Sequence, residues 1–196
     1  MVVRLRCMVQ IDMVGTWQRL AYEELGSTSD SIDTGDFSAN DSLKVVIFGI
    51  ATNNITFKLR FNGSTGSEYA FRTSLNSASS PSPDVSESYL NIGTGFTQPA
   101  NIYSVVYITN VKDKEKLVIA ETTCSQAGIS NLPERRELIG KWASNDQVTQ
   151  IVVHNTDTGD YASGSYIAVY GSGDIITDEK TTLTNVPANT RYEEYD

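Results

Sequence analysis

Short β-rich runs separated by turn residues constrain the fold of this chain more than any other feature of its sequence. Residues 43–50 are almost continuously apolar, as expected for a strand that is buried on both sides or lies at the centre of a sandwich. Residues 100–110 form the longest β-branched and aromatic run, and residues 115–123 pair naturally with them across the charged turn at 112–114. Together with runs at 17–25, 56–61, 67–72, 137–142, 150–154 and 165–170, they predict about ten strands at spacings typical of sandwiches and barrels.

The stretch 56–72 carries the clearest hairpin signal. Apolar residues at 57, 59 and 61 alternate with Lys58 and Arg60, and Gly63 and Gly66 supply the positive φ of a turn before the chain returns. Residues 73–83 are rich in Ser and Pro and predict a loop, while residues 133–138 offer at most one helical turn. We therefore predict an all-β, antiparallel β-sandwich, with a jelly roll as its expected form.

The two ends of the 196-residue chain differ from its middle, which is the size of one sandwich domain. Residues 1–16 form an apolar, slightly basic N-terminal arm whose aliphatic side chains need a surface to cover, either their own sandwich or a neighbouring subunit. Residues 17–171 form the predicted β-sandwich domain. Residues 172–196 are acidic and poor in aliphatic residues, which is typical of an extended tail ordered by a partner.

The charge and the cysteines restrict the partners and the compartment. A net charge of −9 repels phosphates, so nucleic acid and anionic membranes are unlikely main partners. No segment approaches the roughly 18 apolar residues of a transmembrane helix, and the interrupted N-terminus is a poor signal peptide, so we expect no membrane insertion. Cys7 and Cys124 match no zinc or redox spacing; we interpret them as free thiols, although one disulfide is arithmetically possible.

No set of residues predicts catalysis. The single histidine, His154, ends a predicted strand without a nucleophile motif nearby, so we interpret it as a strand-end residue rather than a general base. Residues 157–160 (DTGD) carry oxygen ligands like those of a calcium loop but lack the acidic spacing of an EF-hand, and a tight turn explains them equally well. We expect no enzyme activity, no metal and no cofactor.

Partner contacts are the more promising use of the polar and aromatic residues. Trp17 and Trp142 lie in strand patterns and are assigned to the core, whereas Tyr161, Tyr192 and Tyr195 lie in loop or tail sequence and are freer to contact a partner. The pair Arg135 and Arg136, beside glutamates at 134 and 137, suits an inter-subunit salt-bridge cluster or, equally, a solvated turn.

Four stretches resemble a β-sandwich module of viral and phage structural proteins: RFNGSTGSEYAFR (60–72), KEKLVIAETT (114–123), RRELIGKWAS (135–144) and VVHNTDTGDYASGSYIAVYG (152–171). The resemblance covers residues 17–171 and is one of pattern, without a diagnostic catalytic motif. It implies a capsid, decoration, tail or fibre subunit that is made in the host cytoplasm and located in the virion, with itself and other virion proteins as partners.

The leading hypothesis is therefore a self-assembling virion structural protein that acts through homo-oligomeric contacts. The alternative is a carbohydrate-binding or adhesion module that binds a host glycan through aromatic residues in the loops near 73–98 or 155–164. A polysaccharide-cleaving enzyme is a third possibility, for which the sequence offers only scattered carboxylates.

Overall fold

The computed structural model describes residues 17–76, 79–96, 101–125 and 132–172. Within these ranges the chain forms twelve strands and no helix, which confirms the predicted all-β class. Every strand pairing is antiparallel. The predicted arm, 1–16, and all of the predicted tail except Ser172 lie outside the described residues.

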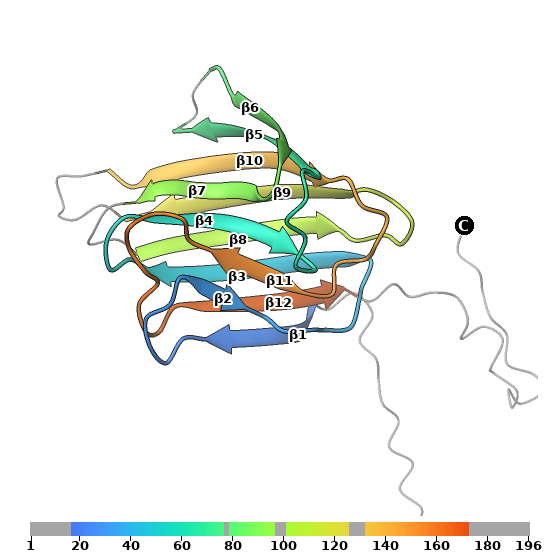
Figure 1. The fold of residues 1–196 in the computed structure, drawn as a ribbon, viewed down its shortest axis with the longest axis horizontal. Coiled ribbons are helices and arrows are strands. Elements are labelled where there is room, and N and C mark those ends of the chain that lie inside the picture. Colours follow the sequence, from blue (N-terminus) through green and yellow to red (C-terminus); the bar gives the residue numbers. More distant parts are fainter. Residues whose placement is uncertain (1–16, 77–78, 97–100, 126–131, 173–196) are drawn as a thin grey trace, which may run out of the picture.

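The strands form two sheets, drawn in Figure 1, and the smaller sheet lies over the larger one. The large sheet has eight strands, in the order β1 (Trp17–Glu24), β12 (Tyr166–Ser172), β3 (Ser42–Ile50), β8 (Asn101–Thr109), β9 (Lys116–Cys124), β10 (Glu134–Trp142), β5 (Tyr69–Leu75) and β6 (Ser82–Glu87). The small sheet has four, in the order β2 (Ser31–Asp33), β11 (Ile151–His154), β4 (Ile55–Phe61) and β7 (Leu90–Phe96).

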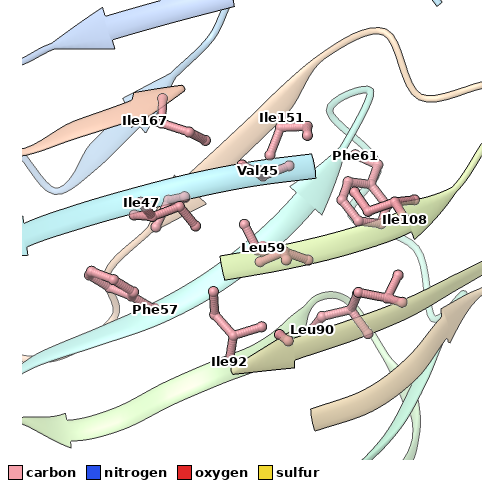
Figure 2. Packing of buried hydrophobic residues seen from close by; sticks show 14 of the residues in the cluster. Val45, Ile47, Phe57, Leu59, Phe61, Leu90, Ile92, Ile108, Ile151 and Ile167 are labelled. Atoms are coloured by element: carbon pink, nitrogen blue, oxygen red, sulfur yellow. The ribbon is translucent and has the colours of Figure 1, made fainter. Parts of the chain in front are cut away.

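One hydrophobic core fills the space between the sheets. Figure 2 shows side chains of the large sheet, among them Val45 and Ile47, meeting Phe57, Leu59 and Ile151 of the small sheet. The alternation of the strands produces this core, since successive side chains point to opposite faces of a sheet. In β8 and β9 every second side chain is buried, and the polar pair Ser104 and Thr122 is buried with its hydroxyls 2.8 Å apart.

The predicted hairpin between residues 56–61 and 67–72 is wrong. The turn has the expected positive φ at Gly63, but the second positive φ is at Asn62 and not at Gly66. Strand β4 lies in the small sheet and β5 in the large one, so the chain crosses between sheets at this corner. The Asn62 side chain fixes the corner by donating to the Gln147 carbonyl at 2.8 Å and accepting from the Thr149 N–H at 2.9 Å. A turn signal alone does not distinguish a hairpin from such a corner.

Three smaller expectations also need correction. The stretch predicted as a loop, 73–83, contains the end of β5 and the start of β6, and the possible helical turn at 133–138 is the first half of β10. The strand at 43–50 is not buried on both sides. Its apolar residues Val46 and Phe48 are only half-buried and point away from the small sheet.

Candidate functional site

The outer face of the large sheet, which is turned away from the small sheet, is apolar and aromatic. The side chains that alternate with the buried ones on β1, β12, β3, β8, β9 and β10 point to this face. We call this surface the aromatic face, and it comprises Trp17, Tyr22, Val46, Phe48, Tyr103, Val105, Tyr107, Leu117, Ile119, Ile139, Tyr166 and Tyr170.

The register of the strands aligns these residues in rows that cross the sheet. One row runs Tyr170, Lys44, Tyr107, Ile119 and Ile139, each directly opposite the next. A second row, two residues along each strand, contains Val46 and Val105, and a third row runs Tyr166, Phe48 and Tyr103. Side chains opposite one another on adjacent strands lie within contact distance, so the face is continuous across its central strands.

Aromatic contacts hold several of these rings in place. The rings of Phe48 and Tyr166 are stacked with centroids 5.6 Å apart, and Tyr22 lies 5.7 Å from Tyr166. At the sheet end where β1 begins, the ring of Trp17 lies 6.5 Å from that of Tyr107. Pairs at these separations contribute about 0.5–1.5 kcal/mol beyond the area they bury, so the face is a pre-formed surface rather than a set of independent side chains.

Much of this apolar surface is open to solvent. Tyr107 is 47% exposed, Ile119 56% and Ile139 69%. Single exposed apolar residues are ordinary, but a contiguous group of them on one sheet face is typical of an interaction site. Charged groups also lie on this face: Lys44 stands between Tyr170 and Tyr107 in the first row, and Arg135 pairs with Glu137 at 2.8 Å on the outer face of β10. Apolar and aromatic side chains mixed with a few charged ones are a composition that protein interfaces share.

A second cluster lies on the outer face of the small sheet, around His154. In register, Lys58 of β4 lies between His154 of β11 and Asn91 of β7. Tyr89 covers this group, with the Lys58 Nζ 4.1 Å from its ring centroid and the His154 ring at 6.0 Å. Arg60 donates to the Ser88 carbonyl at 3.1 Å and so holds the segment that carries Tyr89.

His154 is neutral at pH 7 in this setting. Burial lowers its pKa to about 4, and the positive charges of Arg60 and Lys58 act in the same direction. The His154 Nε2 and the Asn91 Oδ1 are buried and have no hydrogen-bond partner. His154 is the last residue of β11, the strand-end position expected from the sequence, and its side chain is half-buried.

Tyr161, predicted to be free for a partner, is instead fully buried, and that prediction is wrong. Its exposed fraction is 0%, its ring packs edge-on to Phe57 at 5.5 Å, and its hydroxyl donates to the Thr56 carbonyl at 2.5 Å. The backbone of Tyr161 also bridges Ser29 and Ala51, so its loop closes one end of the sandwich. Burial raises the pKa of this tyrosine well above its usual value.

The two predicted arginines do not form one cluster. They are neighbours in strand β10, so their side chains point to opposite sides of the sheet. Arg135 is on the outer face with Glu137, whereas Arg136 is half-buried on the inner side, where burial lowers its pKa and its Nε has no hydrogen-bond partner. The other two predicted contact residues, Tyr192 and Tyr195, lie outside the described residues.

The candidate calcium loop at 157–160 is organised by a side chain of the protein. Asn155 accepts from the Asp157 N–H at 3.1 Å and donates to the Asp157 carbonyl at 3.1 Å and to the Gly159 carbonyl. A hydrogen bond to Asp30 raises the pKa of Asp160. The described residues contain no group of three or more His, Cys, Asp or Glu side chains placed to hold a metal ion.

Cys124 carries a free thiol on the inner side of β9, and burial raises its pKa to about 11; Cys7 lies outside the described residues. Within the described part of the chain, no helix has the length and apolar character needed to cross a membrane. Comparison of the sequence and structure with protein-family models, curated proteins and solved structures finds no match to any of them.

Proposed function

We propose that this protein is a self-assembling structural subunit whose copies associate through the aromatic face. The observation that carries the proposal is the contiguous exposed apolar surface described above, which the core of the subunit does not use. The six strands that carry this face, each about 30 Å long at a spacing of about 4.8 Å, cover roughly 860 Å², close to the ~800 Å² per partner of a standard protein interface. Covering it with a second protein surface removes apolar area from water, which favours association.

The order of the strands supports a jelly roll within this sandwich. If β5, β6, β9 and β10 are treated as an extension of the large sheet, eight strands remain. Numbered one to eight along the chain, they lie in the orders 1-8-3-6 and 2-7-4-5 in the two sheets. This interleaving of early and late strands is the order of two nested Greek keys, the arrangement used by viral capsid and lectin domains.

We further propose that the assembly is a virion component, of the capsid, decoration or tail and fibre kind. This step rests on the resemblance of residues 17–171 to viral and phage structural modules, together with the jelly-roll order and the apolar face. The other partners are then further virion proteins, and the location is the virion after synthesis in the host cytoplasm. A subunit with this role needs no catalytic site.

The oligomeric mass of the full-length protein, measured by light scattering across a dilution series, tests the proposal. We expect a discrete oligomer or a larger particle that Ile119→Glu dissociates and Leu132→Glu does not. Leu132 is 85% exposed and lies outside the aromatic face, so it is a matched control for adding a charge to an exposed aliphatic position. A wild-type protein that is monomeric at every concentration would overturn the proposal.

A glycan-binding module is the second candidate, and the aromatic face also supports it. The stacked pair Phe48 and Tyr166, with Tyr103 opposite Phe48, presents flat rings on which the C–H faces of a sugar can pack, together with hydroxyls that can hydrogen-bond to it. This candidate expects the wild-type protein to be a monomer that binds glycans on an array and loses binding in Tyr103→Ala but not in Leu132→Ala. Absence of binding to any host glycan would count against it.

A further inference from the structure

The apolar residues of the N-terminal arm alternate with polar ones. At the odd positions stand Val3, Leu5, Cys7, Val9, Ile11 and Met13, whereas the even positions from 4 to 12 carry Arg, Arg, Met, Gln and Asp. In a β-strand successive side chains point to opposite sides, so this spacing gives an extended segment one wholly apolar side. A segment with that pattern gains stability only where an apolar surface covers this side.

The chain that precedes Trp17 reaches the large sheet at the aromatic face. Trp17 is the first residue of β1 and pairs with Ser172, the last residue of β12, which in turn lies opposite Ser42. The Trp17 ring is on the outer side and lies 6.5 Å from the ring of Tyr107. The arm therefore joins the sandwich at one end of the surface that its apolar side would match.

The direction of β1 favours a neighbouring copy as the recipient. Strand β1 begins at Trp17 and runs into the sheet, so a chain that continues it backwards leads away from the subunit. To cover the face of its own subunit, the arm would have to reverse its direction within residues 15–16. Sixteen extended residues reach at most about 53–58 Å, enough to span a strand of about 30 Å on a second subunit. The arm carries +2 − 1 = +1, and the rest of the chain −9 − 1 = −10, so charge favours contact between an arm and the body of a subunit.

We propose that residues 1–16 of one copy lie in extended form along the aromatic face of a neighbouring copy, with their odd-numbered side chains against it. This inference rests on the proposed function, since it names the segment that makes the homo-oligomeric contact. The occupant of the face is then an arm rather than the face of a second subunit, and each subunit both gives an arm and receives one.

A thiol placed on the face reports whether the arm covers it. In a Cys7→Ala background, Ile139→Cys puts a reactive thiol at an exposed position of the face, while Cys124 is buried and reacts slowly. In the assembled full-length protein, we expect labelling of the Ile139→Cys thiol by a thiol reagent to be at least about tenfold slower than labelling of a Leu132→Cys thiol outside the face.

The alternation in the arm supplies the matched pair of variants. Val9→Asp places a carboxylate on the apolar side of the arm, and Gln10→Asp places the same group on the polar side. We expect Val9→Asp to restore fast labelling of the Ile139→Cys thiol and Gln10→Asp to leave it protected. Equal protection in both variants would show that something other than the arm covers the face and would overturn the inference.

Mixing two chains decides whose arm it is. One chain carries the face thiol and the Val9→Asp arm, and the other has an intact arm and no added thiol. Protection that returns when the two are co-assembled supports the neighbour's arm, whereas labelling that stays fast places the arm on its own subunit and overturns the inference. Light scattering on the same samples separates the two proposals: an oligomer with an unprotected thiol defeats only the arm contact, and a monomer at every concentration defeats self-assembly as well.

Discussion

Replacement of Asn155 by alanine should destabilise the fold by more than replacement of an exposed asparagine that makes similar hydrogen bonds. Its carboxamide makes five hydrogen bonds: it accepts from the Thr56 N–H at 2.8 Å, the Thr56 hydroxyl at 3.1 Å and the Asp157 N–H, and it donates to the carbonyls of Asp157 and Gly159. Asn155 and Thr56 are 8% and 6% exposed, so water does not reach the Thr56 groups that would lose their partner, whereas Asp157 is exposed.

The magnitude follows from the groups left unsatisfied. The Thr56 N–H and the Gly159 carbonyl are buried, and each orphaned buried group costs about 1–3 kcal/mol, which gives a loss of about 2–6 kcal/mol. For a chain of this length, that lowers Tm by roughly 4–24 °C, at about 2–4 °C per kcal/mol. Equilibrium urea unfolding followed by tryptophan fluorescence measures the loss directly, because Trp142 is buried in the core.

Asn62 is the matched control, because its side chain also joins distant backbone groups but is exposed to water. Asn62→Gly keeps the positive φ of 51° accessible and should cost only about 1 kcal/mol, since water replaces the lost partners. If Asn155→Ala cost no more than Asn62→Gly, the reasoning from burial would be refuted.

Three further substitutions have outcomes set by single contacts. His154 has a pKa of about 4 in the folded protein, below its usual 6.5, so the unfolded chain binds a proton that the folded chain does not, and stability should fall as the pH drops from 6.5 toward 4. In His154→Gln, the loss of unfolding free energy between pH 7 and pH 4.5, measured by urea unfolding, should be smaller by about 1–2 kcal/mol. Tyr161→Phe should cost about 1–3 kcal/mol by leaving the Thr56 carbonyl unpaired, and a calorimetric Tm equal to wild type would contradict this. Lys116→Met should lower the free energy of unfolding by a similar amount, because the buried Lys116 ammonium donates to the Val111 carbonyl at 2.9 Å and to two other backbone carbonyls. An unchanged midpoint of urea unfolding would contradict this.

The strands were predictable because their signal is local. The run at 100–110, the charged turn and the run at 115–123 form the β8–β9 pair as expected, with Asp113 supplying the positive φ of the turn. The corner after β4 was not predictable in this way, because alternation and turn residues describe each strand and each reversal but not the sheet in which the next strand pairs. That choice is made by non-local partners such as β10, more than sixty residues along the chain from β5.

The candidate site was harder to predict than the strands for a related reason. In β3 and β8 both alternating sets of side chains are mostly apolar or aromatic, with Lys44 and Ser104 as exceptions, so the sequence does not show clearly which set faces the small sheet. Trp142 is 2% exposed, as predicted, but Trp17 is 42% exposed and lies on the outer face, contrary to its assignment to the core. Tyr161 was misplaced because its polar, glycine-rich surroundings conceal a loop that closes the end of the sandwich. The signal available beforehand was the doubly apolar character of β3.

If copies associate as proposed, the two faces of the large sheet have separate roles, the inner one in folding and the outer one in association. The core cluster draws its side chains from the inner side of the large sheet, whereas Ile119 and Ile139 keep more than half of their surface in solvent and contribute little to it. A charge at Ile119 should therefore leave the urea midpoint of a diluted sample nearly unchanged while abolishing the oligomer, whereas a cavity in the core, such as Leu59→Ala, should cost about 2–5 kcal/mol. If Ile119→Glu lowered stability as much as the core variant, the outer face would be part of the folding core, and the physical basis for assigning it to association would be lost.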